Sequence, residues 1–313
     1  KILIPDTISL IDEESFSDCT SLNEIIIPDS VKYIKTNAFK GCTSLEKITV
    51  NPYIDIDPTA FNDCISLKYL TFAESASQMS EKEYKLNSEI FHSITHITIP
   101  SSITIIKEKA FYEYKTLEEI SLPETLTTIE DYSFYGCSSL NNISLPKSLK
   151  TLGKYVFSKC STLKRIIIPE LIDKINEYSF SECTSLQEII LTDNIKNIEQ
   201  HSFEKCQTLT NIKLPKDITT LNEFLFSNCS SLIEIELPKT LTTICSYSFN
   251  ECSSLKTIEL PTTISYISEY SFYKCSSLTR ITLPPSINSI QKGTFGKCSS
   301  LKEIAIPDSV ETI

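Results

Sequence analysis

The chain has 313 residues, of which 41% are hydrophobic, and its 40 acidic and 29 basic residues give a formal net charge of −11. This acidic balance disfavours nonspecific binding to nucleic acid, which depends on neutralised phosphates, and docking on an anionic membrane. No apolar run reaches the roughly 18 residues that a membrane-spanning helix needs, so direct insertion into a membrane is not expected.

A phenylalanine recurs along the whole chain, and from Phe111 onward every step is 23 residues. Self-similarity at a period of about 20 to 50 residues is typical of solenoids, in which each unit buries its apolar face only against its neighbours. We therefore predict a single elongated domain over residues 1–313, with about 13 repeats. The recurring phenylalanines are Phe16, Phe39, Phe61, Phe111, Phe134, Phe157, Phe180, Phe203, Phe226, Phe249, Phe272 and Phe295.

Each repeat carries the same residue types at fixed distances after its phenylalanine. Two aliphatic residues at positions nine and eleven share one face of a short strand, and the proline that usually follows ends that strand. Aliphatic residues at positions fifteen and eighteen predict an extended or turn-like leg on another side. The segment around the phenylalanine is too short for a full helix and fits one helical or 3₁₀ turn. Cysteine, serine or threonine, and leucine usually stand three, five and six residues after the phenylalanine. In the repeat of Phe134 all of these positions hold Cys137, Ser139, Leu140, Ile143, Leu145, Pro146, Leu149 and Leu152.

The unit F-x-x-C-x-S-L-x-x-I-x-L-P-x-S-L-x-x-I resembles the BspA-like, Treponema-type leucine-rich repeat over essentially the whole chain. The resemblance implies an α/β leucine-rich-repeat solenoid, right-handed and curved. Its parallel strands would lie on the concave face and its short helical or 3₁₀ turns on the convex side. The resemblance also implies a binding or adhesion module of the kind found on host-associated bacteria and parasitic protists. The glycine that often follows the last aliphatic residue in this family is present only at Gly153.

One repeat departs from the period. The best alignment places Ser88 in the phenylalanine slot, 27 residues after Phe61, and Phe91 in the cysteine slot. The surplus residues fall in a polar insertion at 73–89, which we expect to form an exposed loop. Such loops often carry function, although a drifted repeat with a harmless loop is the simpler interpretation.

Eleven of the twelve cysteines lie three residues after a phenylalanine slot, and only Cys245 lies outside this register. A disulfide framework is typical of small secreted domains, whereas an odd number of in-register cysteines in a long chain favours reduced thiols that act as small core residues. The absence of any C-x-x-C spacing argues against a zinc site. Cys245 occupies a position that is polar in other repeats, so we expect it to be the most exposed and reactive thiol.

Two further columns invite a functional interpretation. Serine or threonine stands five residues after every phenylalanine slot, and we expect its hydroxyl to bond backbone groups because no histidine recurs beside it as a base. Two residues before the phenylalanine, seven successive repeats carry an aromatic ring. This column is interpreted as a stabilising stack on the convex side, with an exposed strip that grips a protein or glycan as the alternative. Its members are Tyr132, Tyr155, Tyr178, His201, Phe224, Tyr247 and Tyr270.

Positions eight and ten after each phenylalanine should face outward from the predicted strands and vary between repeats. In the second half they hold two adjacent isoleucines followed by an acidic patch, a pattern that fits either a partner-specific surface or a solvated face. We predict a concave partner-binding surface formed by Arg165, Ile167, Glu188, Ile190, Lys213, Glu234, Glu236, Glu259 and Arg280.

No phosphate loop, nucleophile elbow or metal-binding helix motif occurs in the chain, so no enzyme, cofactor or metal is expected. The first hypothesis is a cell-surface adhesion or ligand-recognition module for a host or matrix protein, which rests on the family resemblance. The second is an intracellular scaffold or regulatory subunit, cytoplasmic or nuclear, which rests on the apparently reduced cysteines. We also expect the chain to be a piece of a longer protein and its uncovered C-terminal repeat to permit a symmetric homodimer.

Overall fold

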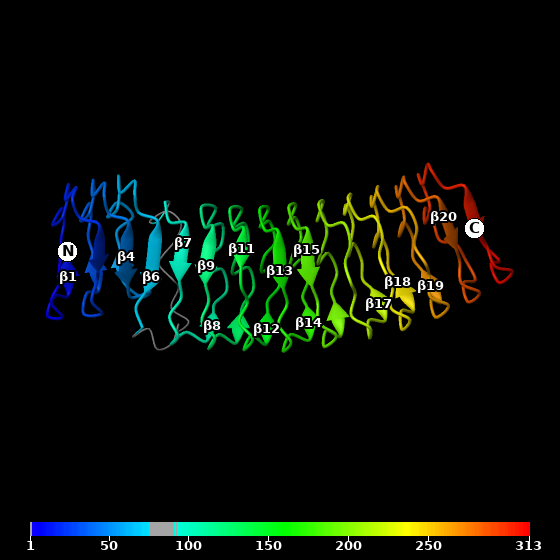
Figure 1. Cartoon of the computed structure of the whole chain (residues 1–313), viewed down its shortest axis with the longest axis horizontal. Helices are drawn as coiled ribbons and strands as arrows, with labels where there is room; N and C mark the ends of the chain where they lie inside the picture. The colour runs from blue at the N-terminus through cyan, green and yellow to red at the C-terminus, as the bar shows by residue number, and fades with distance from the viewer. Residues whose placement is uncertain (1, 75–90, 92) are drawn as a thin grey trace.

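The computed structural model describes residues 2–74, 91 and 93–313. They form a long solenoid in which successive coils of the chain lie side by side along one axis, with the two termini at opposite ends (Figure 1). Most paired strands of neighbouring coils are offset by 23 residues, as in the pairing of Glu119 with Asn142.

The first row of strands contains the aliphatic residue at position nine, as the sequence predicts, whereas only β4 and β6 extend to the one at position eleven. Six of its strands form one continuous parallel sheet in the order β11-β9-β7-β6-β4-β2, and β13–β15 and β20–β21 form separate pairs. The strands of this row are β2 (Glu24–Ile26), β4 (Lys47–Val50), β6 (Tyr69–Phe72), β7 (His96–Thr98), β9 (Glu119–Ser121), β11 (Asn142–Ile143), β13 (Arg165–Ile167), β15 (Glu188–Ile190), β20 (Arg280–Thr282) and β21 (Glu303–Ala305).

The leg at positions fifteen to eighteen forms a second row of parallel strands on another side of the coil. Each strand is two residues long and ends on a buried aliphatic residue, which stands at position eighteen in the 23-residue repeats. The strands of this row are β1 (Leu10–Ile11), β3 (Tyr33–Ile34), β5 (Asp55–Ile56), β8 (Ile105–Ile106), β10 (Thr128–Ile129), β12 (Thr151–Leu152), β14 (Lys174–Ile175), β16 (Asn197–Ile198), β17 (Thr220–Leu221), β18 (Thr243–Ile244) and β19 (Tyr266–Ile267).

The turn around each recurring phenylalanine makes a third set of contacts between coils. The N–H groups of Tyr132, Phe134 and Gly136 donate to carbonyl oxygens of the next coil over 2.9, 3.0 and 2.8 Å. Tyr132 and Gly136 adopt left-handed backbone conformations, with φ of 57° and 72°. Because alternate N–H groups are directed at the neighbouring coil, they cannot form the hydrogen bonds of a helix. The described residues contain strands and turns but no helix, so the α/β class with helical or 3₁₀ turns is not confirmed.

Backbone hydrogen bonds link neighbouring coils on three sides of the solenoid. Because hydrogen-bonded strands keep a fixed spacing, these bonds limit how far the coils can spread apart on one side. Figure 1 accordingly shows a gently bowed rod whose ends rise within the plane of the view, while the first row of strands faces the viewer. We call the exposed surface of this row the strand face. It lies along a flank of the slight bow (Figure 1), so the predicted concave position of these strands is not confirmed.

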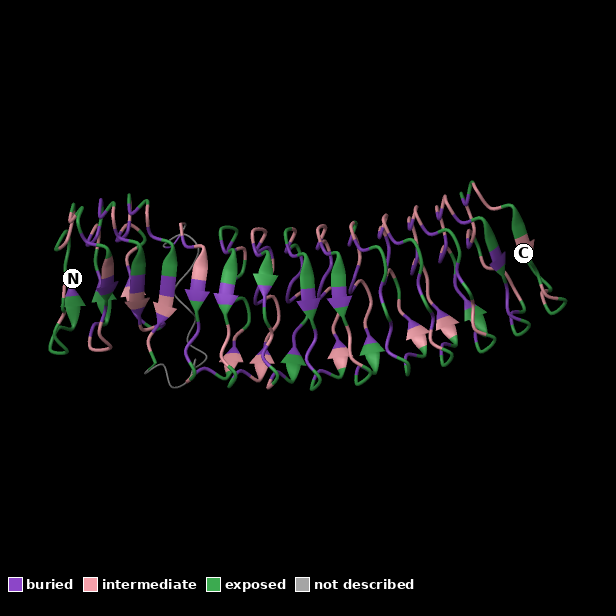
Figure 2. Ribbon diagram, viewed as in Figure 1, coloured by how far each residue is buried: buried purple, intermediate pink, exposed green. Residues whose placement is uncertain are grey.

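The core consists of stacked columns. The recurring phenylalanines from Phe39 to Phe272 are at most 3% exposed. Successive rings along the regular repeats lie 5.2 to 5.8 Å apart between centroids, as in the 5.6 Å contact of Phe157 with Phe180. Figure 2 shows the buried residues running through the rod, with exposed residues on either side of them in the strands.

The irregular repeat keeps its place in the stack. β6 pairs with β7 in a register that joins Tyr69 to His96, which is the expected step of 27 residues. Phe91 has the backbone contact of a cysteine-slot residue, because its carbonyl accepts from Ile94 N–H over 3.1 Å. Its larger ring nevertheless reaches the phenylalanine column and lies 5.5 Å from the ring of Phe61. Ser88, and the insertion at 73–89 beyond Glu74, lie outside the described residues.

All twelve cysteines are free, and ten of the eleven in-register thiols are buried. Each buried thiol donates to the carbonyl oxygen of the phenylalanine in the preceding coil over 3.1 to 3.3 Å, as Cys160 does to Phe134. The predicted core position is confirmed. Cys245 is half-buried, and so is Cys19, so Cys245 is not the single accessible thiol.

Hydroxyl groups also connect the coils. Threonines of the column at position five donate to carbonyl oxygens of the preceding coil, as Thr116 does to Ile94 over 2.9 Å. A second hydroxyl column, not anticipated from the sequence, stands directly before the phenylalanine. From Ser133 onward its members are buried, whereas Ser15 is exposed. Ser202 donates to Glu199 O over 2.6 Å and to Asn176 O in the preceding coil over 3.1 Å.

Candidate binding face

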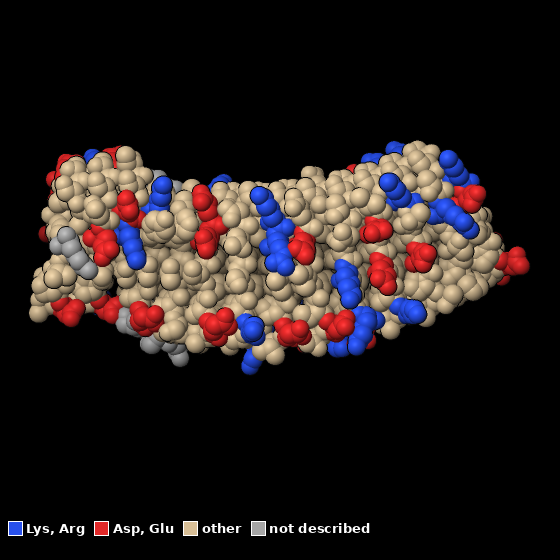
Figure 3. Space-filling model, viewed as in Figure 1, with Lys and Arg blue, Asp and Glu red and all other residues tan. Residues whose placement is uncertain are grey.

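The strand face displays the side chains at positions eight and ten, as predicted. In β13 and β15 the central isoleucine is buried, and the residues on either side of it are exposed. Figure 3 shows acidic and basic side chains distributed across this face of the molecule. The strand face is therefore the surface where the repeats differ chemically from one another.

The ladder of strands is interrupted between β15 and β20. Pairing there is reduced to the isolated bridges Lys213↔Glu236 and Thr257↔Arg280. At position ten these coils carry Lys213, Glu236 and Glu259, where other coils carry mainly isoleucine, threonine or serine. Lysine and glutamate are poor strand formers compared with β-branched residues, and like charges on adjacent strands repel. The charged residues at position ten therefore both set the charge of this region and weaken the strand pairing of its sheet.

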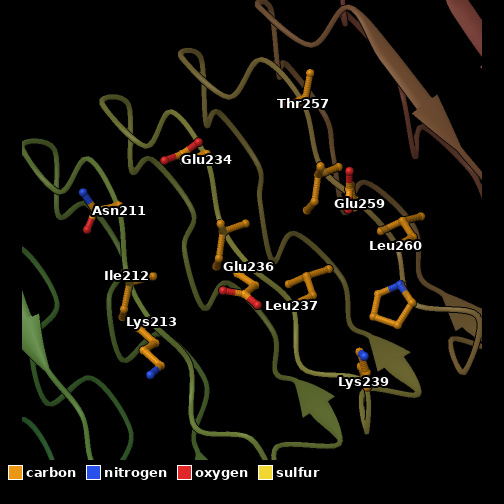
Figure 4. Close-up of a pocket in the computed structure, with 13 residues that line it drawn as sticks. Asn211, Ile212, Lys213, Glu234, Glu236, Leu237, Lys239, Thr257, Glu259 and Leu260 are labelled. Carbon is orange, nitrogen blue, oxygen red and sulfur yellow. The ribbon is translucent and has the colours of Figure 1, made fainter.

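A groove of about 710 Å³ lies over the interrupted ladder (Figure 4). Its floor includes the edges of Ile212, Ile235 and Ile258, which are 5 to 7% exposed. A second hollow of about 520 Å³ continues from Thr257 to Arg280. Further lining residues that the sequence did not single out are Asn211, Leu237, Lys239, Leu260 and Pro261. Lys239 follows the strand segment, beyond the alternating positions from which the face was predicted.

At each margin of this region, an arginine forms an ion pair with a glutamate of the neighbouring coil. Arg165 Nε lies 2.5 Å from Glu188 Oε2, and Arg280 Nε lies 3.7 Å from Glu303 Oε2. In the groove, by contrast, the carboxylates of Glu234, Glu236 and Glu259 and the ammonium groups of Lys213 and Lys239 make no ion pair or hydrogen bond with any described residue. The unpaired charges of the strand face are thus concentrated where the ladder opens.

The predicted isoleucine pair lies beside the groove. Ile167 and Ile190 are neighbours in the register of β13 and β15, and their side chains are 47% and 37% exposed. The structure therefore places all nine predicted residues on one face, with an apolar section followed by a charged groove and a paired arginine at each margin.

The protein-family model of the BspA type leucine-rich repeat region matches residues 1–90, 85–210 and 197–313 of the sequence. The chain belongs to this family. A leucine-rich repeat protein from Bacteroides ovatus is 26% identical, with a TM-score of 0.67 over 98% of this chain and 87% of that chain. The pneumococcal vaccine antigen PcpA is 20% identical, with a TM-score of 0.52 over 97% and 79% of the two chains. A leucine-rich cell surface protein from Faecalibacterium prausnitzii is 22% identical, with a TM-score of 0.43 over 96% and 77%. No curated protein matches the chain.

The aromatic column of this BspA-type chain is a closed stack. Its rings are 4.2 to 5.1 Å apart between centroids and within 9° of parallel. The Lys109 ammonium lies 5.7 Å from the Tyr132 ring, and the Lys292 ammonium lies 5.8 Å from the Tyr270 ring at the other end. Burial, with Tyr178 beside it, raises the pKa of Tyr155 to about 12. Since ring faces are covered along the stack, the predicted stacking of this column is confirmed, and all seven rings remain half-buried at the surface.

Within the described residues, no three histidine, cysteine, aspartate or glutamate side chains are grouped so that they could hold a metal ion. Over that same part of the chain, no helix has the length and apolar character needed to cross a membrane. His201 Nδ1 lies 2.8 Å from Glu204 Oε2, inside the aromatic stack. His96 Nε2 lies 3.7 Å from Glu119 Oε2 on the strand face, and His92 lies outside the described residues.

Proposed function

We propose that this chain is a non-enzymatic protein-binding solenoid that recognises a protein ligand through the second half of its strand face. Leucine-rich repeat proteins are in general protein-interaction modules, and family membership supports that broad class. The observation that supports the location is the groove of about 710 Å³, whose charges lack partners within the described chain. Charges left unpaired on a grooved surface favour a partner of complementary charge.

The role proposed for this binding is adhesion or ligand recognition at a cell surface. The competing hypothesis, an intracellular scaffold, drew on the in-register cysteines as a sign of a reducing compartment. Cys160, Cys183 and Cys206 are 0% exposed, so solvent oxidants cannot reach them and their reduced state is compatible with either location. Labelling of intact cells with a membrane-impermeant biotin reagent distinguishes the two: the surface role requires labelled protein, and labelling only after lysis supports the scaffold.

Capture of proteins from a host or matrix extract tests the binding face. The wild-type chain is compared with a Glu234→Lys, Glu236→Lys, Glu259→Lys variant. A Glu223→Lys, Glu269→Lys variant is the control, because these exposed glutamates flank the aromatic column on the turns. We expect proteins held by the wild type and the control to be lost from the groove variant, and to be released by added salt. Identical capture by all three proteins would refute this binding face.

A further inference from the structure

Five side chains at position ten form a continuous stripe along the rod, one from each of five successive coils. They are Ile167, Ile190, Lys213, Glu236 and Glu259, and all are exposed. The pairing of β13 with β15 sets the two isoleucines side by side, and the isolated bridge sets Lys213 beside Glu236. Figure 4 shows the last three on successive segments of the groove. The stripe therefore changes along the axis from apolar to cationic to anionic.

The length of the stripe suits a short extended peptide. Four steps between neighbouring coils, at about 4.8 Å each, separate the first position of the stripe from the last by about 19 Å. An extended chain advances about 3.3 Å per residue, so about six residues cover this distance when they lie along the axis of the rod. Side chains on one face of such a segment recur about every 6.6 Å, so three or four of them can meet the stripe.

The charges of the stripe are available to a ligand. At its margin, Arg165 and Glu188 satisfy each other, and opening that pair to bind a ligand would cost their mutual interaction. Glu236 and Glu259 have no such partner in the described chain, and neither has Lys213. A ligand cation placed against these carboxylates gains charge-assisted hydrogen bonds without displacing an existing ion pair.

We propose that the stripe binds an extended segment of a partner protein whose side chains follow the complementary order. An apolar side chain covers Ile167 and Ile190, an acidic side chain meets Lys213, and basic side chains meet Glu236 and Glu259. This inference rests on the proposed function, because it specifies the chemistry of the ligand for the same face. Burial of the exposed isoleucines under the ligand contributes to affinity, and the groove charges select the orientation of the segment.

Selection from a random dodecapeptide display library, with the whole 1–313 chain as bait, tests this inference. Selected peptides are synthesised and titrated against the wild type, an Ile167→Thr, Ile190→Thr variant and a Glu236→Thr, Glu259→Thr variant. Threonine already occupies position ten in β4, β6, β7 and β20, so these replacements suit the fold. The Glu223→Lys, Glu269→Lys variant serves again as the control.

We expect the selected peptides to share two basic residues and, about four to six positions away, an apolar residue. Their affinity should fall at least tenfold for each stripe variant and stay unchanged for the control. Peptides that need the groove glutamates but share no such order would overturn the inference and leave the proposed binding face intact. Peptides that bind every variant equally would overturn both. A library without any enriched peptide would exclude an extended segment, and the capture experiment would still decide the function.

Discussion

At the scale of single residues, two aromatic columns with similar stacking geometry have different surroundings. Phe203 is fully buried between Phe180 and Phe226, with ring centroids 5.8 and 5.7 Å away. Phe224 lies between His201 and Tyr247 at 4.6 and 4.7 Å, and remains half-exposed at the surface. The column of Phe224 thus has the shorter distances between rings but is the less buried of the two columns. The contributions of ring stacking and of burial to stability can therefore be measured separately.

Phe203→Ala should lower the free energy of unfolding by about 3–5 kcal/mol, because it removes a buried ring and leaves a cavity. Phe224→Ala should cost less, about 1–3 kcal/mol, since mainly two stacking contacts of roughly 0.5–1.5 kcal/mol each are lost. Urea denaturation followed by circular dichroism measures both. Equal losses, or an unchanged midpoint for Phe203→Ala, would contradict the assignment of the phenylalanine column as the core.

The residue pattern predicts which side chains are buried far better than it predicts backbone conformation. Burial of the phenylalanines, the in-register cysteines and the paired aliphatics follows from their period. The left-handed conformation of Tyr132 or Tyr155 does not, because aromatic residues seldom adopt it. It is tolerated here where the residue stacks on the next coil and its N–H bonds to that coil. Those stabilising contacts lie between repeats, so a single repeat does not reveal them.

At the scale of elements, the buried thiols form a column that should make the fold sensitive to alkali. Burial raises the pKa of the Cys229 thiol to about 12 and that of the Cys298 thiol to about 11, from an ordinary value of 9.0. Burial likewise raises the pKa of Cys160, Cys206 and Cys252 well above that value. The unfolded chain therefore ionises these thiols first. The stability they contribute is complete below pH 9 and is lost as pH rises from there toward the folded-state pKa values.

Within that window, each such thiol should lower the free energy of unfolding by about 1.4 kcal/mol for every unit by which the pH rises, because it ionises in the unfolded chain. Urea denaturation at pH 8, 9 and 10 measures the slope. A Cys160→Ala, Cys206→Ala variant should be less stable at pH 8 and yet show a shallower decline with pH. Cys245→Ser, outside the column and half-buried, should change the slope less. Equal slopes for the double variant and the wild type would show that these thiols do not govern the alkaline response.

The elements themselves were only partly predictable. The I-x-L pair indicates the first row of strands, and the aliphatics at fifteen and eighteen indicate an extended leg, which pairs as a second row. A segment such as YSFYGC carries no helical period, and only its length favours a helical turn. Its alternate N–H groups instead bond to the next coil. For the binding face, the residues and their exposure follow from the alternation. The groove does not, because it depends on several weakened pairings acting together.

At the scale of the whole molecule, each coil is covered by its neighbours, so the last coil differs from the others. Leu278, Ile281 and Leu283 are at most 4% exposed under the coil that follows them. Their counterparts Leu301 and Ile304 are half-buried, and Ile306 is 42% exposed. β21 pairs on one side only, with β20, and thus presents an edge of unpaired backbone groups. In the isolated 1–313 polypeptide this apolar end and strand edge are open to a second copy.

The isolated polypeptide should therefore self-associate through its C-terminal coil. A symmetric dimer is the expected form, because a two-fold contact closes whereas head-to-tail contacts continue into fibres. Light scattering at micromolar concentration should give twice the monomer mass of 35.3 kDa. Ile306→Lys should restore the monomer, since it places a charge in the contact without removing a core side chain. Ile233→Lys is the matched control, because Ile233 is 43% exposed but lies in mid-chain, and it should remain dimeric. A monomeric wild type at these concentrations, or equal masses for the two variants, would show that the last coil is stable in water without a partner.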